Sequence, residues 1–255
     1  MSNPIRRPVL AANWKMNHGP TEARAFMAAF LASYSARGDR TIVIFPPAVS
    51  LATVRDALGA RRDIQLGIQT IHTEPKGAFT GENSAPMSKD AGARWVLVGH
   101  SERRHVFGES DEACAKKFAI ALKYELTPML CVGEKIEQRE QGQTEDVVLR
   151  QLRAGLSLLE PKDRESFAIA YEPVWAIGTG KTATPGDASA VHEVIRRELG
   201  VMFESPDSAA QVPILYGGSV TRDNARTLLA AREVDGLLVG GASLDAASWS
   251  AIAST

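Results

Sequence analysis

Short apolar runs alternate along most of the chain with longer segments in which apolar residues recur at helical spacing. The runs are almost continuously hydrophobic, so they lack the in-out alternation of a strand that faces water on one side. We therefore expect strands that other elements cover on both faces. The runs predict strands over Val9–Asn13, Thr41–Phe45, Ile64–Ile68, Trp95–Val98, Thr127–Val132, Phe167–Tyr171, Pro213–Tyr216 and Gly236–Val239.

The segments between these runs predict helices. Phe26, Phe30 and Tyr34 are spaced by four residues and would line one face of the first helix. Gly200 follows a pair of arginines, which predicts a helix end there, because cations suit the C-terminal end of the helix dipole. The predicted helices cover Thr21–Ala36, Val49–Leu58, Glu109–Tyr124, Thr144–Leu159, Asp187–Glu198 and Asp223–Leu229.

This strand-helix order, repeated to eight strands in 255 residues, predicts a closed (β/α)8 barrel. An open doubly wound sheet is the alternative, but a Gly-x-Gly-x-x-Gly turn is expected after its first strand. The chain has Asn13-Trp14-Lys15-Met16-Asn17 at that place. Because no proline-, glycine- or serine-rich linker divides the sequence, we expect one domain over residues 1–255, with its core at about 9–244.

The charge balance excludes some classes of partner. Lysines and arginines number 29 and acidic residues 30, for a net charge of -1, so no overall positive field attracts nucleic acid or an anionic membrane. Cys114 and Cys131 belong to no Cys-x-x-Cys pair, which argues against a disulfide framework or a structural zinc site. The first apolar run is too short for a signal peptide or a membrane span, so we expect a cytoplasmic location.

In a barrel of this kind, functional side chains are expected at the C-terminal ends of the strands. Asn13 and Lys15 follow the first strand, although a lone lysine there is often only a solvated side chain. His100 follows the fourth strand, where the amide dipoles of a helix start would disfavour the imidazolium and keep the ring a neutral donor. The other histidines are expected at surface or boundary positions, namely His18, His72, His105 and His192.

Glu172 ends the sixth strand and is a candidate general base, whose pKa burial would raise. The segment Pro173–Thr182 after it combines large apolar residues with glycines, which predicts a lid that excludes water from a ligand. Its Gly-Thr-Gly-Lys-Thr stretch is similar to a nucleotide-binding P-loop. That motif would require a glycine where the chain has Trp175, so a nucleotide site is disfavoured.

Glycine pairs follow the seventh and eighth strands. These are Gly217-Gly218, followed by Ser219, and Gly240-Gly241. One such pair alone is commonly just a turn. Two pairs at neighbouring barrel exits let backbone amides approach a ligand closely, and this place binds phosphate in many barrels. The pattern therefore predicts a phosphate site.

Five motifs in this order make the sequence resemble the triosephosphate isomerase family. They lie between about Val9 and Leu244, and the tail Asp245–Thr255 carries little of the resemblance. The resemblance implies a single-domain TIM barrel that interconverts dihydroxyacetone phosphate and D-glyceraldehyde 3-phosphate through an enediolate, in glycolysis and gluconeogenesis. The motifs are Asn13-Trp14-Lys15-Met16-Asn17, Gly77-Ala78-Phe79-Thr80-Gly81-Glu82, Gly99-His100-Ser101-Glu102-Arg103-Arg104, Tyr171-Glu172-Pro173-Val174-Trp175-Ala176-Ile177-Gly178-Thr179-Gly180 and Tyr216-Gly217-Gly218-Ser219-Val220.

The resemblance also implies roles for individual residues. Glu172 would move the proton between carbons, neutral His100 would polarise the carbonyl, and Lys15 would face the anionic substrate. Asn13 would orient the substrate, with Ser101 and Glu102 in support. No metal and no cofactor is implied. The phosphate would be held by Gly178, Ser219, Gly240 and Gly241.

The long aperiodic segment Gln69–Ser88 is expected to be a functional or interface loop. The resemblance implies that it inserts into a second subunit, so that Thr80 approaches the partner's Asn13 and Lys15 in a homodimer. It further implies that Glu82 pairs with Arg103 and that Glu102 lies near Lys15. Thr70 stands where the family commonly has Asn, and Cys131 is interpreted as a buried structural thiol.

Two alternatives remain at this point. Another phosphosugar barrel, such as an indole-pathway isomerase or a pentose phosphate epimerase, would share the glycine-rich exits but not the set of Lys15, His100 and Glu172. A non-catalytic phosphate-binding barrel would be expected to lack one of these three groups, and all three are present.

Overall fold

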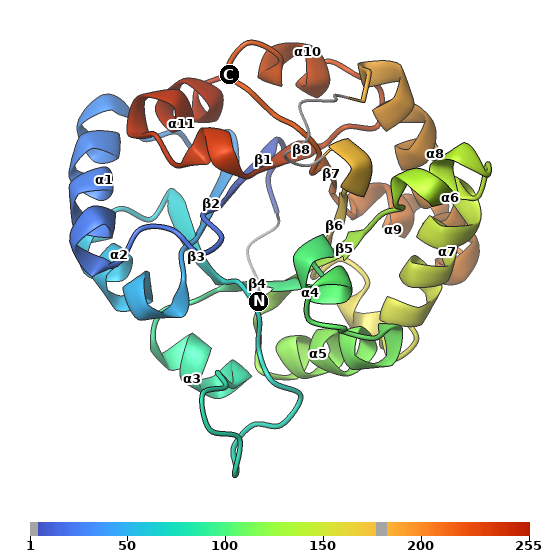
Figure 1. Cartoon of the computed structure of the whole chain (residues 1–255), viewed down its shortest axis with the longest axis horizontal. Coiled ribbons are helices and arrows are strands. Elements are labelled where there is room, and N and C mark those ends of the chain that lie inside the picture. Colours follow the sequence, from blue (N-terminus) through green and yellow to red (C-terminus); the bar gives the residue numbers. More distant parts are fainter. Residues whose placement is uncertain (1–4, 177–182) are drawn as a thin grey trace.

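The computed structural model describes residues 5–176 and 183–255. Its strands are all parallel and close into a barrel in chain order, so that the eighth pairs with the first, which confirms the predicted fold (Figure 1). The strands are β1 (Val9–Asn13), β2 (Thr41–Phe45), β3 (Ile64–Ile68), β4 (Trp95–Val98), β5 (Thr127–Val132), β6 (Ala168–Tyr171), β7 (Ile214–Tyr216) and β8 (Gly236–Val239).

The strand bounds match the predictions except at the starts of β6 and β7. Each begins one residue later than expected, at Ala168 and Ile214. Pro213 has no N–H to donate to a ladder, so it remains outside β7. Phe167 instead packs against the rings of Phe118 and Phe203, with centroid distances of 5.2 and 6.4 Å.

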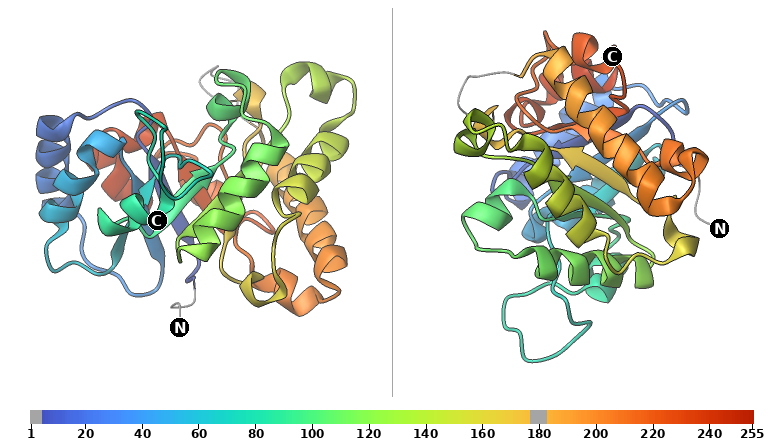
Figure 2. Two further views of the ribbon diagram at one scale, coloured as in Figure 1. Left: turned by 90° about the horizontal axis from the view of Figure 1, so that it is seen from below. Right: turned by 90° about the vertical axis from the view of Figure 1, so that its right-hand side faces the viewer.

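Helices surround the barrel (Figures 1 and 2). Six of them correspond to predicted segments: α1 (Pro20–Ser33), α2 (Leu51–Leu58), α5 (Asp111–Lys123), α7 (Thr144–Gly155), α8 (Pro185–Phe203) and α10 (Ala225–Leu229). The sequence did not predict five others, which have only five to eight residues and so show no sustained period: α3 (Ala85–Asp90), α4 (Ser101–His105), α6 (Ile136–Glu140), α9 (Pro206–Gln211) and α11 (Ala246–Ala253). Single 3-10 turns occur at η1 (Ala48–Ser50), η2 (Pro161–Asp163), η3 (Val174–Ala176) and η4 (Gly241–Ser243). Among the described helices, none has the length and apolar character needed to cross a membrane.

The predicted end of α8 at Gly200 is wrong, because the helix continues to Phe203. Leu199 and Phe203 are four residues apart and both buried, so packing outweighs the cost of a glycine inside the helix. The helix ends where Glu204 adopts a left-handed backbone, with φ 53°. Its start is capped by the Thr184 side chain, which accepts the Asp187 N–H at 3.1 Å.

The core has two layers. An inner layer fills the barrel with alternate residues of the strands, among them Val9, Phe45, Trp95 and Cys131. An outer layer lies between the strands and the helices. It includes Trp249 of α11, so the buried core extends beyond the predicted limit near residue 244.

The segment between β3 and α3 projects from the barrel as a long loop (Figure 2). The His72 N–H donates to the Asn83 carbonyl at 2.8 Å and closes the base of the loop. The His72 ring packs on Phe79, with centroids 3.9 Å apart. The loop is therefore braced by its own contacts, and Phe79 remains 42% exposed at its tip.

Candidate active site

A cavity of about 450 Å³ opens at the C-terminal ends of the strands. It brings together predicted residues from five strand exits: Asn13, Lys15, His100, Glu172, Ser219, Gly240 and Gly241. Larger cavities lie beside Arg196, at about 600 Å³, and beside Lys123, at about 970 Å³. Only the first of these three joins a buried carboxylate and an imidazole to a lysine and two glycine pairs, so we take it as the candidate active site.

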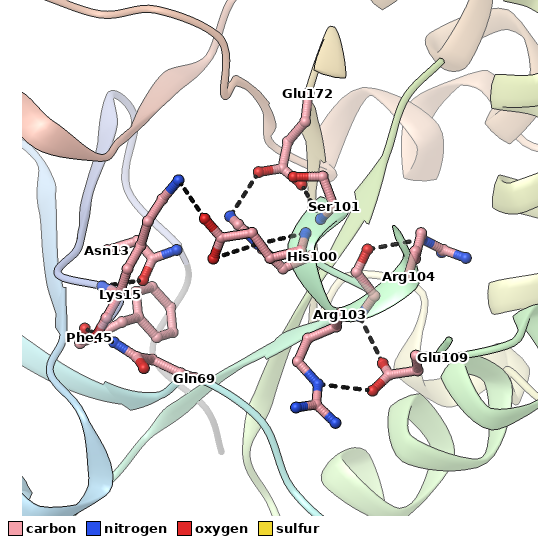
Figure 3. A network of polar contacts seen from close by, with 12 residues as sticks. Asn13, Lys15, Phe45, Gln69, His100, Ser101, Arg103, Arg104, Glu109 and Glu172 are labelled. Carbon is pink, nitrogen blue, oxygen red and sulfur yellow. Dashed lines mark hydrogen bonds and ion pairs between the residues drawn. The ribbon is translucent and has the colours of Figure 1, made fainter. Parts of the chain in front are cut away.

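Lys15 follows β1 in a left-handed backbone conformation, with φ 51°. Side chains hold both its backbone polar groups: its N–H donates to Asn13 Oδ1 at 3.0 Å, and its carbonyl accepts from Gln69 Nε2 at 2.8 Å (Figure 3). Gln69 Nε2 also donates to the Phe45 carbonyl at 3.0 Å. The Lys15 ammonium lies 2.8 Å from Glu102, as the resemblance implied.

His100 caps the N-terminus of α4. Its Nδ1 accepts the N–H of Glu102 at 3.3 Å, so the proton of the neutral ring lies on Nε2, which faces Glu172 Oε1 at 3.0 Å (Figure 3). Burial lowers the pKa of His100, but the carboxylates of Glu172 and, to a smaller extent, Glu102 outweigh burial and raise the pKa overall. The predicted lowering is therefore wrong for this arrangement, because β6 places a carboxylate directly against the ring.

Glu172 is 2% exposed at the exit of β6. Its Oε2 accepts the Ser101 N–H at 3.0 Å, while Oε1 contacts His100. Burial raises the pKa of Glu172, but His100, the Ser101 N–H and Lys15 together outweigh burial and lower it. The predicted rise is therefore also wrong here. Gly133 makes room for this strand end, since a Cβ there would lie 1.8 Å from the Glu172 carbonyl oxygen.

The glycine pairs after β7 and β8 line the same cavity. A Cβ at Gly240 would lie 3.5 Å from Lys15 Cε, so the segment that follows β8 lies next to the Lys15 side chain. The Ser219 carbonyl accepts from Asn224 Nδ2 at 3.1 Å, which holds the β7 exit in place. Gly178, the remaining predicted phosphate ligand, lies outside the described residues.

Residues 173–176 of the predicted lid lie within the described part of the chain. Trp175 of η3 donates from its indole nitrogen to Glu134 Oε1 at 2.9 Å, and the Arg139 guanidinium lies 4.6 Å from its ring centroid. Glu134 is fully buried and also accepts from the Tyr171 hydroxyl at 3.1 Å. The rest of the predicted lid, residues 177–182, lies outside the described part of the chain.

Two polar contacts around the site differ from or extend the predictions. Arg103 lies 3.3 Å from Glu109, and no ion pair joins it to Glu82 within the described residues of one subunit. Thr70 accepts from Lys117 Nζ at 3.0 Å. Gln69 and Glu109 were not predicted as site residues, although Gln69 directly follows the third predicted strand, which is the signal that marks the other exits.

Histidine and cysteine side chains elsewhere serve the core. His192 is fully buried, not at a boundary as expected; its Nδ1 contacts the Glu233 carbonyl at 2.8 Å, and burial lowers its pKa to about 4. Burial raises the pKa of Cys114 to about 12 and that of Cys131 well above the ordinary value. Within 5–176 and 183–255, no cluster of three or more histidine, cysteine or acidic side chains could hold a metal ion.

The chain is similar to one family of known proteins over nearly its whole length. A family model described as triosephosphate isomerase matches residues 8–255, including the tail that carried little of the resemblance in the sequence. The chain is 51% identical over 245 residues to the triosephosphate isomerase of Roseiflexus castenholzii, covering 96% of both chains. It is 48% identical over 248 residues to that of Symbiobacterium thermophilum, covering 97% of this chain and 96% of the relative. The chain therefore belongs to the triosephosphate isomerase family.

Proposed function

We propose that this protein interconverts dihydroxyacetone phosphate and D-glyceraldehyde 3-phosphate by moving a proton between adjacent carbons through an enediolate. The observation that carries the proposal is the contact between the buried Glu172 carboxylate and the Nε2–H of His100, in one cavity with Lys15 and the glycine pairs. A carboxylate can take a proton from carbon, while the imidazole and ammonium can stabilise charge on oxygen.

Glu172 acts as the base in this proposal. Its two oxygens are held by His100 and the Ser101 N–H, so a substrate bound between the carboxylate and the imidazole would displace it from both. The contacts with His100 and the Ser101 N–H, which lower its pKa, would then be lost, while burial, which raises the pKa, would remain. The carboxylate would thus become a stronger base once the substrate is in place.

His100 supplies a neutral donor. Its Nδ1 lone pair faces the Glu102 N–H at the start of α4, so protonating Nδ1 would break that hydrogen bond. Glu172 contributes most to raising the pKa of His100, with a smaller contribution from Glu102, and a bound substrate would replace the contact to Glu172. Nε2–H would then face the substrate oxygen that becomes negative in the enediolate.

The opposite side of the cavity suits the phosphate. Backbone amides at the exits of β7 and β8 would bind its oxygens, and the Lys15 ammonium would add positive charge. Gly178, Ser219, Gly240 and Gly241 are the proposed phosphate ligands, and Asn13 orients the substrate. Closure of a lid over the ligand would exclude water and would restrain the enediolate from eliminating phosphate.

We also propose a cytoplasmic, single-domain enzyme of glycolysis and gluconeogenesis that works as a homodimer. Four large apolar side chains are exposed in the projecting loop, in α3 and in the segments that follow β1 and α4: Phe79 at 42%, Met87 at 58%, Met16 at 95% and Phe107 at 65%. Exposed apolar surface of this kind is often covered by a partner at an interface. Thr80 at the loop tip would reach Asn13 and Lys15 of the partner.

Phe79→Asp tests the dimer, because a charge at the loop tip would oppose its insertion. Sedimentation equilibrium should show that the variant is a monomer, and an activity assay should show reduced turnover. Val201→Asp is the matched control, since Val201 is an exposed apolar residue, 67% accessible, on α8. A dimeric Phe79→Asp with full activity would contradict the proposed interface.

Turnover of glyceraldehyde 3-phosphate in the presence of a chelator tests the reaction itself. The parent should isomerise the substrate, and Glu172→Gln should lower kcat by about 10²–10⁴-fold, the usual contribution of a positioned base. Glu198→Gln is the control, since Glu198 pairs with Arg153 on the outer helices. Absence of turnover by the folded parent would overturn the function, and unchanged turnover by Glu172→Gln would overturn the role of Glu172.

A further inference from the structure

Arg104 of α4 has a side chain that is almost entirely buried and has no part in the proposed chemistry. Its side chain is only 6% exposed, and each of its nitrogens has a partner. Nε donates to the Gly99 carbonyl at 2.7 Å, Nη1 to Asp111 at 2.6 Å and Nη2 to the Cys131 carbonyl at 3.1 Å. The guanidinium is thus held at three points directly beside the residue that precedes His100.

Gly99 depends on these contacts. It has a left-handed backbone, with φ 68°, so it cannot continue the ladder of β4. Side chains bind both its backbone polar groups: its N–H donates to Glu109 at 3.2 Å, and its carbonyl accepts from Arg104. A Cβ at this position would lie 2.6 Å from Arg104 Nη2, which shows how closely the guanidinium packs on this peptide.

The same guanidinium joins two neighbouring strand ends. The ladder between β4 and β5 has Val98 opposite Leu130 as its last pair. One residue further along each strand, Arg104 binds the carbonyls of Gly99 and Cys131. It therefore continues the connection between β4 and β5 beyond the point where backbone hydrogen bonds end. Figure 3 shows Arg104 on one side of His100 and Lys15 on the other.

We propose that Arg104 is a positioning residue for His100, and this inference rests on the proposed isomerase activity. The carbonyl that Arg104 binds belongs to the peptide bond between Gly99 and His100. The imidazole is itself tied to the start of α4 through the Glu102 N–H. Fixing this peptide against β5 therefore fixes the place from which Nε2–H points into the cavity.

Only an arginine fits these partners. The planar guanidinium presents donors in a fixed fork, whereas a lysine ammonium is a single point on a flexible stem. Arg150 provides a matched comparison, because it also pairs with Asp111 but is 58% exposed and is not bonded to Gly99. Comparing the same substitution at Arg104 and at Arg150 thus distinguishes the effect of losing the contact to Gly99 from the effect of losing a contact to Asp111.

Steady-state kinetics of Arg104→Lys test the inference. We expect kcat to fall about 10- to 100-fold, the cost of a small misplacement of a reacting group, with KM within a few-fold of the parent because Lys15 and the glycine pairs are untouched. Arg150→Lys should keep the parent kcat. A kcat of Arg104→Lys close to that of the parent would overturn the inference.

A second measurement separates positioning from general support of the fold. In a His100→Gln background, Arg104→Lys should cause little further loss, because residues that act through one another are not additive. An equal loss in both backgrounds would overturn the inference. The ¹⁵N signal of the His100 imidazole should also change in Arg104→Lys and not in Arg150→Lys, a readout that does not need turnover.

Asp111→Asn is the milder variant if Arg104→Lys does not fold. It weakens the anchor of Nη1 and keeps the arginine, so a smaller drop in kcat with the same change in the imidazole signal is expected. An unchanged kcat and an unchanged signal would contradict positioning by Arg104. A parent that fails to isomerise triose phosphates would overturn the proposed function, while the imidazole signal would still decide the role of Arg104.

Discussion

The two ends of the barrel use charged side chains differently. At the N-terminal end, Arg196 binds both Glu233, at 3.0 Å, and Asp235, and Arg7 binds Asp235 at 2.8 Å. Arg7 precedes β1, Glu233 and Asp235 precede β8, and Arg196 is on α8. In this cluster the charged side chains pair with one another. At the C-terminal end, the chain of contacts runs through Lys15, Glu102, His100 and Glu172 around an open cavity.

The two ends differ in whether a bound ligand could replace the contacts between the charged side chains. A substrate entering the cavity would take over the contacts of Lys15, His100 and Glu172, so these pairs are suited to being exchanged. No ligand is needed to complete the pairs around Arg196. The account therefore predicts that changes at the N-terminal end lower stability, while changes at the C-terminal end lower turnover.

Apart from loss of the base Glu172, the largest effect on turnover is expected from Lys15→Met, which keeps the length of the side chain and removes its charge. Loss of one group that stabilises developing negative charge commonly costs about 10²–10³-fold, so kcat/KM should fall by that order. Thermal stability should change little, since the ion pair of Lys15 with Glu102 is partly exposed. A stable variant with full kcat/KM would break the proposed division between the ends.

The converse change is Arg196→Met. The Arg196 side chain is 14% exposed and that of Asp235 is 13% exposed, so the variant removes one of the two cations that pair with a nearly buried carboxylate. Urea unfolding should show a loss of up to about 3 kcal/mol, the low end for a broken buried pair, because Arg7 still pairs with Asp235. The kcat per folded molecule should match the parent. A variant as stable as the parent, but with reduced kcat, would reverse the assignment.

His192 sharpens the comparison through pH, because it contacts Glu233 near this cluster. Its pKa of about 4 lies below the usual value near 6.5, so between these values the unfolded chain binds more protons than the folded one. Stability is then lost as the pH falls. From pH 8 to 5, the loss from this group is about 2 kcal/mol. Unfolding of His192→Phe should lack this slope, and equal slopes for variant and parent would contradict the prediction.

The strand pattern and the order of polar residues at strand ends could be predicted from the sequence. Parallel strands buried on both faces produce apolar runs, and a polar residue such as Lys15, His100 or Glu172 directly after such a run is easy to locate. Five short helices, α3, α4, α6, α9 and α11, were not predicted, because segments of five to eight residues do not show a sustained helical period. Their positions follow from capping by residues such as His100.

The directions of the pKa shifts of Glu172 and His100 could not be predicted, because they depend on which side chains at the ends of different strands are in contact. Burial alone raises the pKa of Glu172 and lowers that of His100, but their mutual contact, together with Ser101 and Lys15 around Glu172 and Glu102 beside His100, reverses both shifts. The side chains that hold Lys15 and Gly99 in left-handed conformations, Gln69 and Arg104, were missed for the same reason. Their roles come from hydrogen bonds across strands, which the sequence does not display.

The most direct test of the central claim, that the Glu172 and His100 pair at the barrel mouth moves a proton between carbons, is turnover in D₂O followed by NMR. A carboxylate that takes a proton from carbon exchanges it with solvent in part, so the product should carry deuterium at the carbon next to the carbonyl. Glu172→Gln should show little incorporation over the same time. Product formed by the parent without any deuterium would contradict proton transfer through Glu172.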